Sequence, residues 1–93
     1  VDGIIVLDIK GRLDTANARD FSIAIQPLLQ EDKPNIIVNC EQMSYISSSG
    51  LRCFLILQKS VQKNQGSLII EAMRPEIKNI FEMTGCTSLF NIR

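Results

Sequence analysis

The sequence contains no histidine, and this absence narrows the functions open to it. Histidine is the usual general base near neutral pH and the commonest metal ligand, so a Ser-His-Asp or Cys-His hydrolase is excluded. Nucleotide-binding loops of the GxGxxG or GxxxxGK[ST] type are also missing, because the five glycines are scattered. We therefore predict no catalytic residues and no cofactor, and we expect a non-enzymatic binding module.

Cysteine is scarce and widely spaced. Cys40, Cys53 and Cys86 are odd in number and form no CxxC pair, so neither a zinc knuckle nor a disulfide framework is indicated. We expect no metal site, and we interpret the three cysteines as small core residues in a reducing cytosol.

Net charge and long apolar runs are lacking as well. Lys+Arg and Asp+Glu number 10 each, whereas a nucleic-acid-binding protein normally has a basic excess. No apolar run approaches the ~20 residues that span a bilayer, and no signal peptide is visible. We therefore expect no nucleic-acid partner, no membrane insertion and a cytoplasmic location.

The hydrophobic pattern predicts strands that alternate with helices over a single domain, residues 1–93. Short β-branched runs predict four strands, at residues 4–9, 35–40, 67–72 and 89–92. Helical segments separate these runs, and such crossovers imply an α/β domain with a mainly parallel sheet. Since residues 35–40 are almost continuously apolar, that strand should be covered on both faces or lie at the centre of the sheet.

Local signals refine these elements. Gly11 should end or bulge the first strand, Asp14 or Thr15 should cap the first helix, and Pro27 should kink or break it. We expect a loop over residues 41–46. Pro75 should open the third helix and Gly85 should follow its end.

The serine run Ser47-Ser48-Ser49 before Gly50 is the candidate functional element. It follows a central strand and precedes a helix, at the carboxyl edge of the sheet where ligands and partners dock in parallel α/β folds. One serine can be explained as a helix N-cap and the others as turn residues, and on chemistry alone both interpretations remain open. A phosphate added here would be tolerated by the helix N-terminus, yet it would disrupt a partner surface matched to neutral serines.

The segment Tyr45-Ile46-Ser47-Ser48-Ser49-Gly50-Leu51-Arg52 resembles the DSSGL-type signature of STAS domains, the anti-sigma factor antagonist family. Residues 11–14 resemble the family's G-x-L-D before its first helix, and residues 36–40 correspond to its central strand. Residues 75–85 are similar to its third-helix segment. The resemblance covers nearly the whole chain.

The resemblance implies a STAS-like α/β domain with a mixed or mainly parallel four- to five-stranded sheet and helices largely on one face. It also implies a bacterial regulator that binds an anti-sigma factor, itself a GHKL-type serine kinase, and so frees a sigma factor. The kinase would phosphorylate Ser48, and a serine phosphatase would reverse this. The remaining residues of the signature would contact the partner: Tyr45, Ile46, Ser47, Ser49, Gly50, Leu51 and Arg52.

Three features depart from the family pattern. Ser47 replaces the family's aspartate, and Arg52 stands where small residues also occur. We also expect the family's first strand to be shortened in this chain, since little of the given sequence precedes Val6. Arg52 could clamp a phosphate or face solvent. The alternative function is a STAS module of another assembly, such as a lipid-transporting ABC system or a stressosome scaffold, in which this serine is not phosphorylated.

Overall fold

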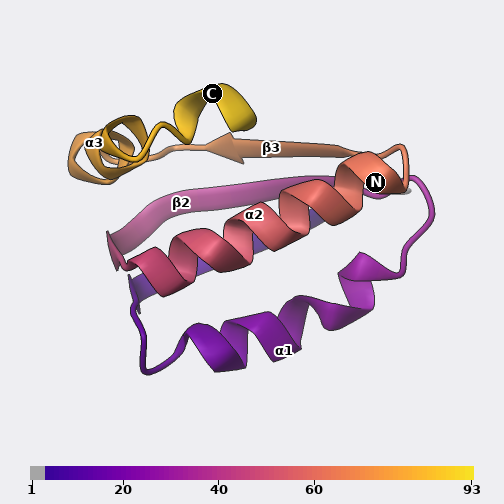
Figure 1. The fold of residues 1–93 in the computed structure, drawn as a ribbon, viewed down its shortest axis with the longest axis horizontal. Coiled ribbons are helices and arrows are strands. Elements are labelled where there is room, and N and C mark those ends of the chain that lie inside the picture. The colour runs from indigo at the N-terminus through magenta and orange to yellow at the C-terminus, as the bar shows by residue number, and fades with distance from the viewer. Residues whose placement is uncertain (1–3) are drawn as a thin grey trace.

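Strands and helices alternate along the chain in a computed structural model that describes residues 4–93 (Figure 1). This confirms the predicted order. The elements are β1 (Ile4–Leu13), α1 (Ala18–Leu29), β2 (Asn35–Ile46), α2 (Ser48–Lys63), β3 (Ser67–Glu71), α3 (Pro75–Met83), the 3-10 helix η1 (Thr87–Leu89) and β4 (Asn91–Ile92).

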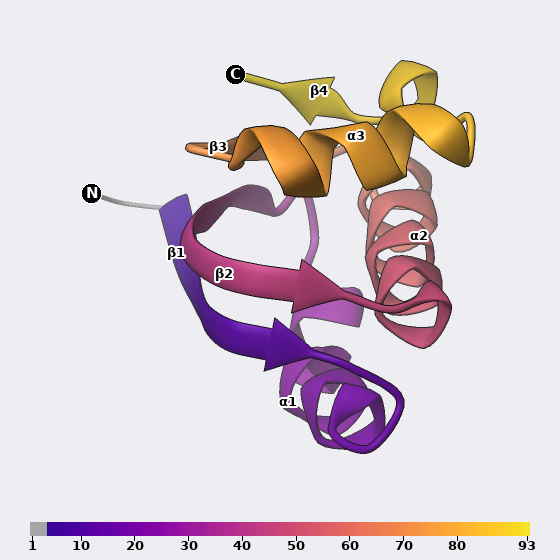
Figure 2. The same cartoon turned by 90° about the vertical axis from the view of Figure 1, so that its left-hand side faces the viewer.

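The four strands form one sheet in the order β1-β2-β3-β4, and every neighbouring pair is parallel. The predicted mainly parallel sheet is confirmed, and residues 4–93 contain no antiparallel pair. Each connection steps to the next strand in the same direction, and right-handed crossovers of this kind direct the connecting helices toward one face of the sheet. Helices α1 and α2 lie side by side on that face, and α3 lies at the end of the sheet where β3 finishes (Figures 1 and 2).

The two faces of the sheet differ in burial. Strand β2 is central, and its Ile36, Val38 and Cys40 point into the core while the residues between them are only partly covered or exposed. Strand β3 repeats the pattern with Leu68 and Ile70. The run at residues 35–40 is therefore apolar because its strand is central, although only one of its faces is packed against helices.

Four phenylalanines join the helices into one core. The ring of Phe54 in α2 lies 5.7 Å from Phe21, 6.0 Å from Phe81 and 6.4 Å from Phe90, centroid to centroid. Burying one such side chain stabilises a fold by roughly 1.5–3 kcal/mol. These contacts tie α2 to α1, to α3 and to the chain before β4, and they fix the helix that begins at Ser48.

The predicted loop over residues 41–46 is wrong, because β2 continues to Ile46. It pairs there with the end of β1, after register shifts between Asp8 and Lys10 and between Gly11 and Arg12. Gly11 has a φ of 75°, which a glycine adopts without strain, and the register shifts directly after it. The predicted irregularity is therefore at Gly11, but the extra residue lies in β2, because Met43 to Tyr45 takes two steps where Gly11 to Arg12 takes one. The shifts break the two-residue alternation of buried and exposed positions, and the sequence pattern therefore looked irregular.

The start of α1 also differs from the prediction. Asp14 and Asn17 exchange hydrogen bonds, with Asp14 N–H donating to Asn17 Oδ1 at 2.8 Å and Asn17 N–H donating to Asp14 Oδ1 at 3.1 Å. This pair closes a turn that precedes the helix, so neither Asp14 nor Thr15 is its N-cap; Asn17 holds that position without a side-chain cap bond.

The break that was allowed for at Pro27 does not occur, because α1 continues to Leu29; a proline in the last turn costs only one hydrogen bond of the helix. The ends of α3 follow the predicted residues. Pro75 opens α3, and Gly85 follows its end with a φ of 74°, both as predicted. The last strand is shorter than expected, because residues 87–89 form the 3-10 helix.

Candidate functional site

The serine run forms the junction between β2 and α2, at the carboxyl edge of the sheet. Ser47 is the N-cap of α2: its backbone is extended, and its Oγ accepts a hydrogen bond from Gly50 N–H at 3.2 Å. The N–H of Ser47 donates to the carbonyl of Leu13 at 2.8 Å, which ties the junction to β1. The sequence left open which of the three serines caps the helix. The hydrogen bond identifies Ser47 as the cap, and its side chain is 8% exposed.

Ser48 is the first residue of α2 and its side chain is exposed, whereas Ser49 is half-buried. No side-chain hydrogen bond formed within residues 4–93 uses the Ser48 hydroxyl. It therefore stands free at the positive end of a helix, where unpaired backbone N–H groups favour an added negative charge.

Gly50 is buried in the first turn of α2. A Cβ at this position would lie 2.9 Å from Ile46 Cγ1 and 2.9 Å from Leu13 Cγ. A glycine is required here because α2 packs closely against the ends of β1 and β2. Gly50 therefore positions the serines. From the sequence, we had interpreted Gly50 as a residue that a partner approaches; the structure gives it this internal role instead.

The other signature residues divide between surface and core. Ile46 and Leu51 are 1% and 5% exposed and belong to the hydrophobic core, so they support the junction from below. Tyr45 and Arg52 are exposed with Ser48. The surface that a partner can reach is therefore smaller than the signature and consists of Tyr45, Ser48, Arg52 and part of Ser49.

Arg12 lies next to this surface and was not among the predicted site residues. Its guanidinium stands 4.5 Å from the centroid of the Tyr45 ring, and its Nε lies 3.6 Å from Asp14 Oδ2. A cation over an aromatic face is attractive, more so where water is excluded. The pairing of Arg12 with Tyr45 follows from the shifted register of β1 and β2, which the sequence does not display.

Arg52 brings positive charge to the start of α2. It follows Ser48 by four residues, so the two side chains lie on the same face of the helix, and the first turn contains no acidic residue. Burial raises the pKa of the neighbouring Cys53 thiol, and the charge of Arg52 offsets part of that rise.

The three cysteines are buried, as the sequence interpretation expected, and each is a free thiol. Burial raises the pKa of Cys40 to about 12, so this thiol stays protonated and unreactive at neutral pH. Within residues 4–93, no group of three or more His, Cys, Asp and Glu side chains is arranged to hold a metal ion. None of the helices in this part of the chain has the length and apolar character to cross a membrane.

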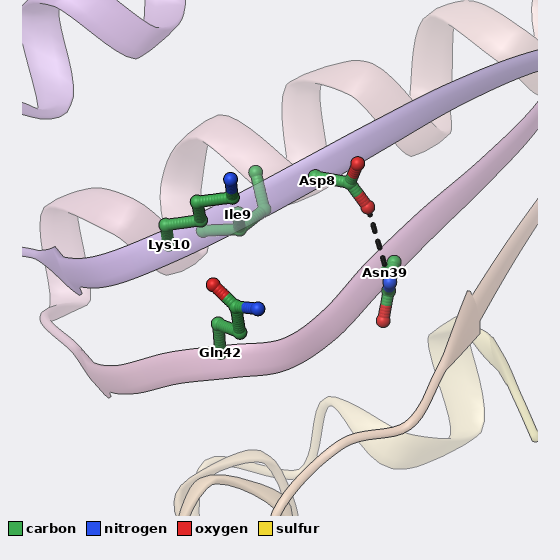
Figure 3. A pocket seen from close by; sticks show the side chains of 5 residues that line it. All are labelled: Asp8, Ile9, Lys10, Asn39 and Gln42. Carbon is green, nitrogen blue, oxygen red and sulfur yellow. Dashed lines mark hydrogen bonds between the residues drawn. The ribbon is translucent and has the colours of Figure 1, made fainter.

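A polar hollow of about 170 Å³ opens between β1 and β2, where the first register shift separates the strands (Figure 3). Asn39 Nδ2 donates to Asp8 Oδ1 across it at 3.0 Å, and Lys10 and Gln42 line its other side. Because the one buried-face residue here, Ile9, has no partner on β2, we interpret the hollow as a consequence of the bulge and assign it no chemistry.

Two relatives cover most of the chain. BtrV of Bordetella bronchiseptica, a candidate anti-sigma factor antagonist, is 26% identical over 92 residues, which are 99% of this chain and 79% of BtrV. The anti-sigma-B factor antagonist of Staphylococcus aureus is 30% identical over 82 residues, 88% of this chain and 76% of that protein.

The same fold occurs in a solved structure. The anti-sigma factor antagonist SpoIIAA, a cell fate determinant of Bacillus, superposes in its unphosphorylated form with a TM-score of 0.82 at 20% identity, covering 100% of this chain and 82% of SpoIIAA. Its phosphorylated form superposes with a TM-score of 0.76. The family model of the STAS domain matches residues 1–93, and the chain therefore belongs to the STAS domain family.

Proposed function

We propose that this chain is an anti-sigma factor antagonist whose binding is switched off by phosphorylation of Ser48. It binds an anti-sigma factor that is also a GHKL-type serine kinase, and the sigma factor is released. The observation that carries the proposal is that the neighbouring serines have different roles. Ser47 caps the helix, so the exposed Ser48 hydroxyl is available to accept a phosphate. The names of the relatives support the same role.

The chain is the acceptor in this reaction and not the catalyst. Ser48 Oγ displaces ADP from the γ-phosphorus of kinase-bound ATP, and a base of the kinase takes the hydroxyl proton. A serine phosphatase hydrolyses the ester and restores the hydroxyl. The product carries ≈ −1.5 to −2 charge at neutral pH, at a helix end that accommodates an anion. The domain stays folded, while the partner must desolvate a phosphate where it had met a neutral hydroxyl.

The geometry also accounts for Ser47 at the position of the family's aspartate. Serine and aspartate are both strong N-caps, and either oxygen can accept the hydrogen bond from Gly50 N–H. The replacement leaves the start of α2 intact, and the residue is buried, so the acceptor assignment stays with Ser48.

Binding of the host's anti-sigma factor, measured by titration calorimetry, tests the proposal. Ser48→Ala should bind like the wild type, because the hydroxyl adds no charge. Ser48→Asp should bind at least about tenfold more weakly, since a desolvated carboxylate costs 1.4 kcal/mol or more. Circular dichroism should be unchanged in both variants.

The control is Ser67→Asp, which adds the same charge to an exposed serine at the start of β3, the opposite edge of the sheet. It also removes the hydrogen bond that Ser67 Oγ donates to Asn35 Oδ1 at 3.0 Å, so its fold is checked by circular dichroism as well. It should bind normally. The proposal fails if Ser48→Asp binds as tightly as the wild type, or if the wild type binds no anti-sigma factor, which would favour another STAS assembly.

A further inference from the structure

The outer face of α2 carries a continuous line of exposed side chains that begins at Ser48. Ser48 and four residues that follow it at spacings of three or four positions lie on one side of the helix, and all five side chains are exposed. We call Arg52, Ile56, Lys59 and Lys63 the basic stripe. Ser48 stands at its head.

Charge is unevenly distributed between this helix and the rest of the chain. Helix α2 contains three cations and no carboxylate, so all ten Asp and Glu residues lie elsewhere in a chain of zero net charge. No cation of the stripe forms an ion pair within residues 4–93, where the ion pairs are Arg12–Asp14 and Arg93–Glu71. The positive charge of the stripe is therefore available to a partner.

A groove of mixed character borders the stripe. A hollow of about 200 Å³ lies between α2 and η1, with Leu55 on one wall and Leu89 on the other. Polar and charged side chains complete its lining: Gln58, Lys59, Gln62 and Ser88. Gln58 Nε2 donates to the carbonyl of Leu89 at 2.8 Å, which holds η1 against α2. Leu89 is 51% exposed and Ile56 is 44% exposed, so apolar side chains accompany the cations on this surface.

We propose, on the basis of the proposed function, that the basic stripe is the docking surface for an acidic face of the anti-sigma factor. One aliphatic side chain of the partner would occupy the groove between Leu55 and Leu89. Complementary charge steers association and fixes orientation, and an apolar anchor adds affinity. Nucleic acid fits this surface less well, because a phosphate backbone offers no apolar group for Ile56 and Leu89 to contact.

The stripe also gives the phosphorylation switch a charge mechanism. A phosphate on Ser48 lies one helical turn from Arg52, within the spacing of an i,i+4 pair, and it offers three strong acceptors to the guanidinium. Arg52 then pairs within the chain and is lost to the partner. The head of the stripe turns from positive to negative, and it repels the acidic face that the stripe attracts.

Paired charge-neutralising variants test this docking surface. Arg52→Gln/Lys59→Gln removes two charges from the stripe, and Lys10→Gln/Lys78→Gln removes two exposed charges outside α2. Dissociation constants for the anti-sigma factor are measured at about 50 mM and about 200 mM sodium chloride, a range over which screening changes strongly. The stripe variant should bind roughly 5- to 30-fold more weakly at low salt and depend less on salt than the wild type.

A third variant isolates the groove. Leu89→Ser should weaken binding by a factor that does not change with salt, because it removes apolar contact and no charge. The control variant should match the wild type throughout.

The outcomes separate this inference from the proposed function. If the stripe and control variants bind alike while Ser48→Asp still weakens binding, the proposed function stands and the docking surface is wrong. If the wild type binds no anti-sigma factor, both are wrong. Binding of a duplex DNA that the stripe variant loses would assign the stripe to nucleic acid and overturn the inference.

Discussion

The two faces of α2 have opposite compositions within sixteen residues. The inner face is apolar and almost fully buried, with Leu51, Phe54, Leu57 and Val61 in the core. The outer face has Ser48 and the basic stripe, and all of its side chains are exposed. The inner face determines whether the domain folds, whereas we propose that the outer face determines what it binds. Substitutions on the two faces should therefore change different observables.

The faces meet at the first turn, where two adjacent serines illustrate the difference. Ser47 is buried and bonds to Gly50, and Ser48 is exposed and unbonded within residues 4–93. The two side chains are chemically identical. Their positions at the start of the helix alone make Ser47 a structural residue and Ser48 a candidate regulatory one.

The largest effect is expected on the inner face. Phe54→Ala removes a side chain that is 1% exposed and contacts three other phenylalanine rings, and it should lower the free energy of unfolding by about 3–5 kcal/mol. Urea denaturation measures the loss. Ile56→Ala, two residues further and on the outer face, is the control and should change stability by less than about 0.5 kcal/mol. Similar losses in the two variants would show that the faces are not energetically distinct.

A smaller effect should separate the two serines. Ser47→Ala removes the cap of α2 and should cost about 1 kcal/mol of stability, while Ser48→Ala should cost almost nothing. The same urea titrations detect the difference. Equal stabilities for the two variants would contradict the assignment of Ser47 as the cap.

Much of the fold could be predicted from the sequence, because its determinants are local and periodic. The runs at residues 35–40 and 67–72 alternate with helical patterns, and Pro75 and Gly85 mark helix ends by their own backbone preferences. The extension of β2 to Ile46 could not be predicted in this way. It depends on two register shifts against β1, a strand that is more than 30 residues away in the sequence.

The candidate site was predicted in place but not in detail. The position of the serine run at the carboxyl edge followed from the order of a strand before it and a helix after it. The separate roles of Ser47, Ser48 and Gly50 depend on which atoms of Leu13 and Ile46 lie beneath them, and this is a property of tertiary packing. The stacking of Arg12 on Tyr45 likewise required the shifted register. The absence of acidic residues from α2, by contrast, is visible in the sequence alone.

The most direct test of the central claim is the site of phosphate transfer. The wild type, Ser47→Ala, Ser48→Ala and Ser49→Ala are each incubated with the host's anti-sigma factor kinase and ATP, and the products are analysed by mass spectrometry. The account predicts one phosphate on the wild type, Ser47→Ala and Ser49→Ala, and none on Ser48→Ala. A phosphate that persists on Ser48→Ala would contradict it, because the exposed hydroxyl at the head of α2 would then not be the acceptor.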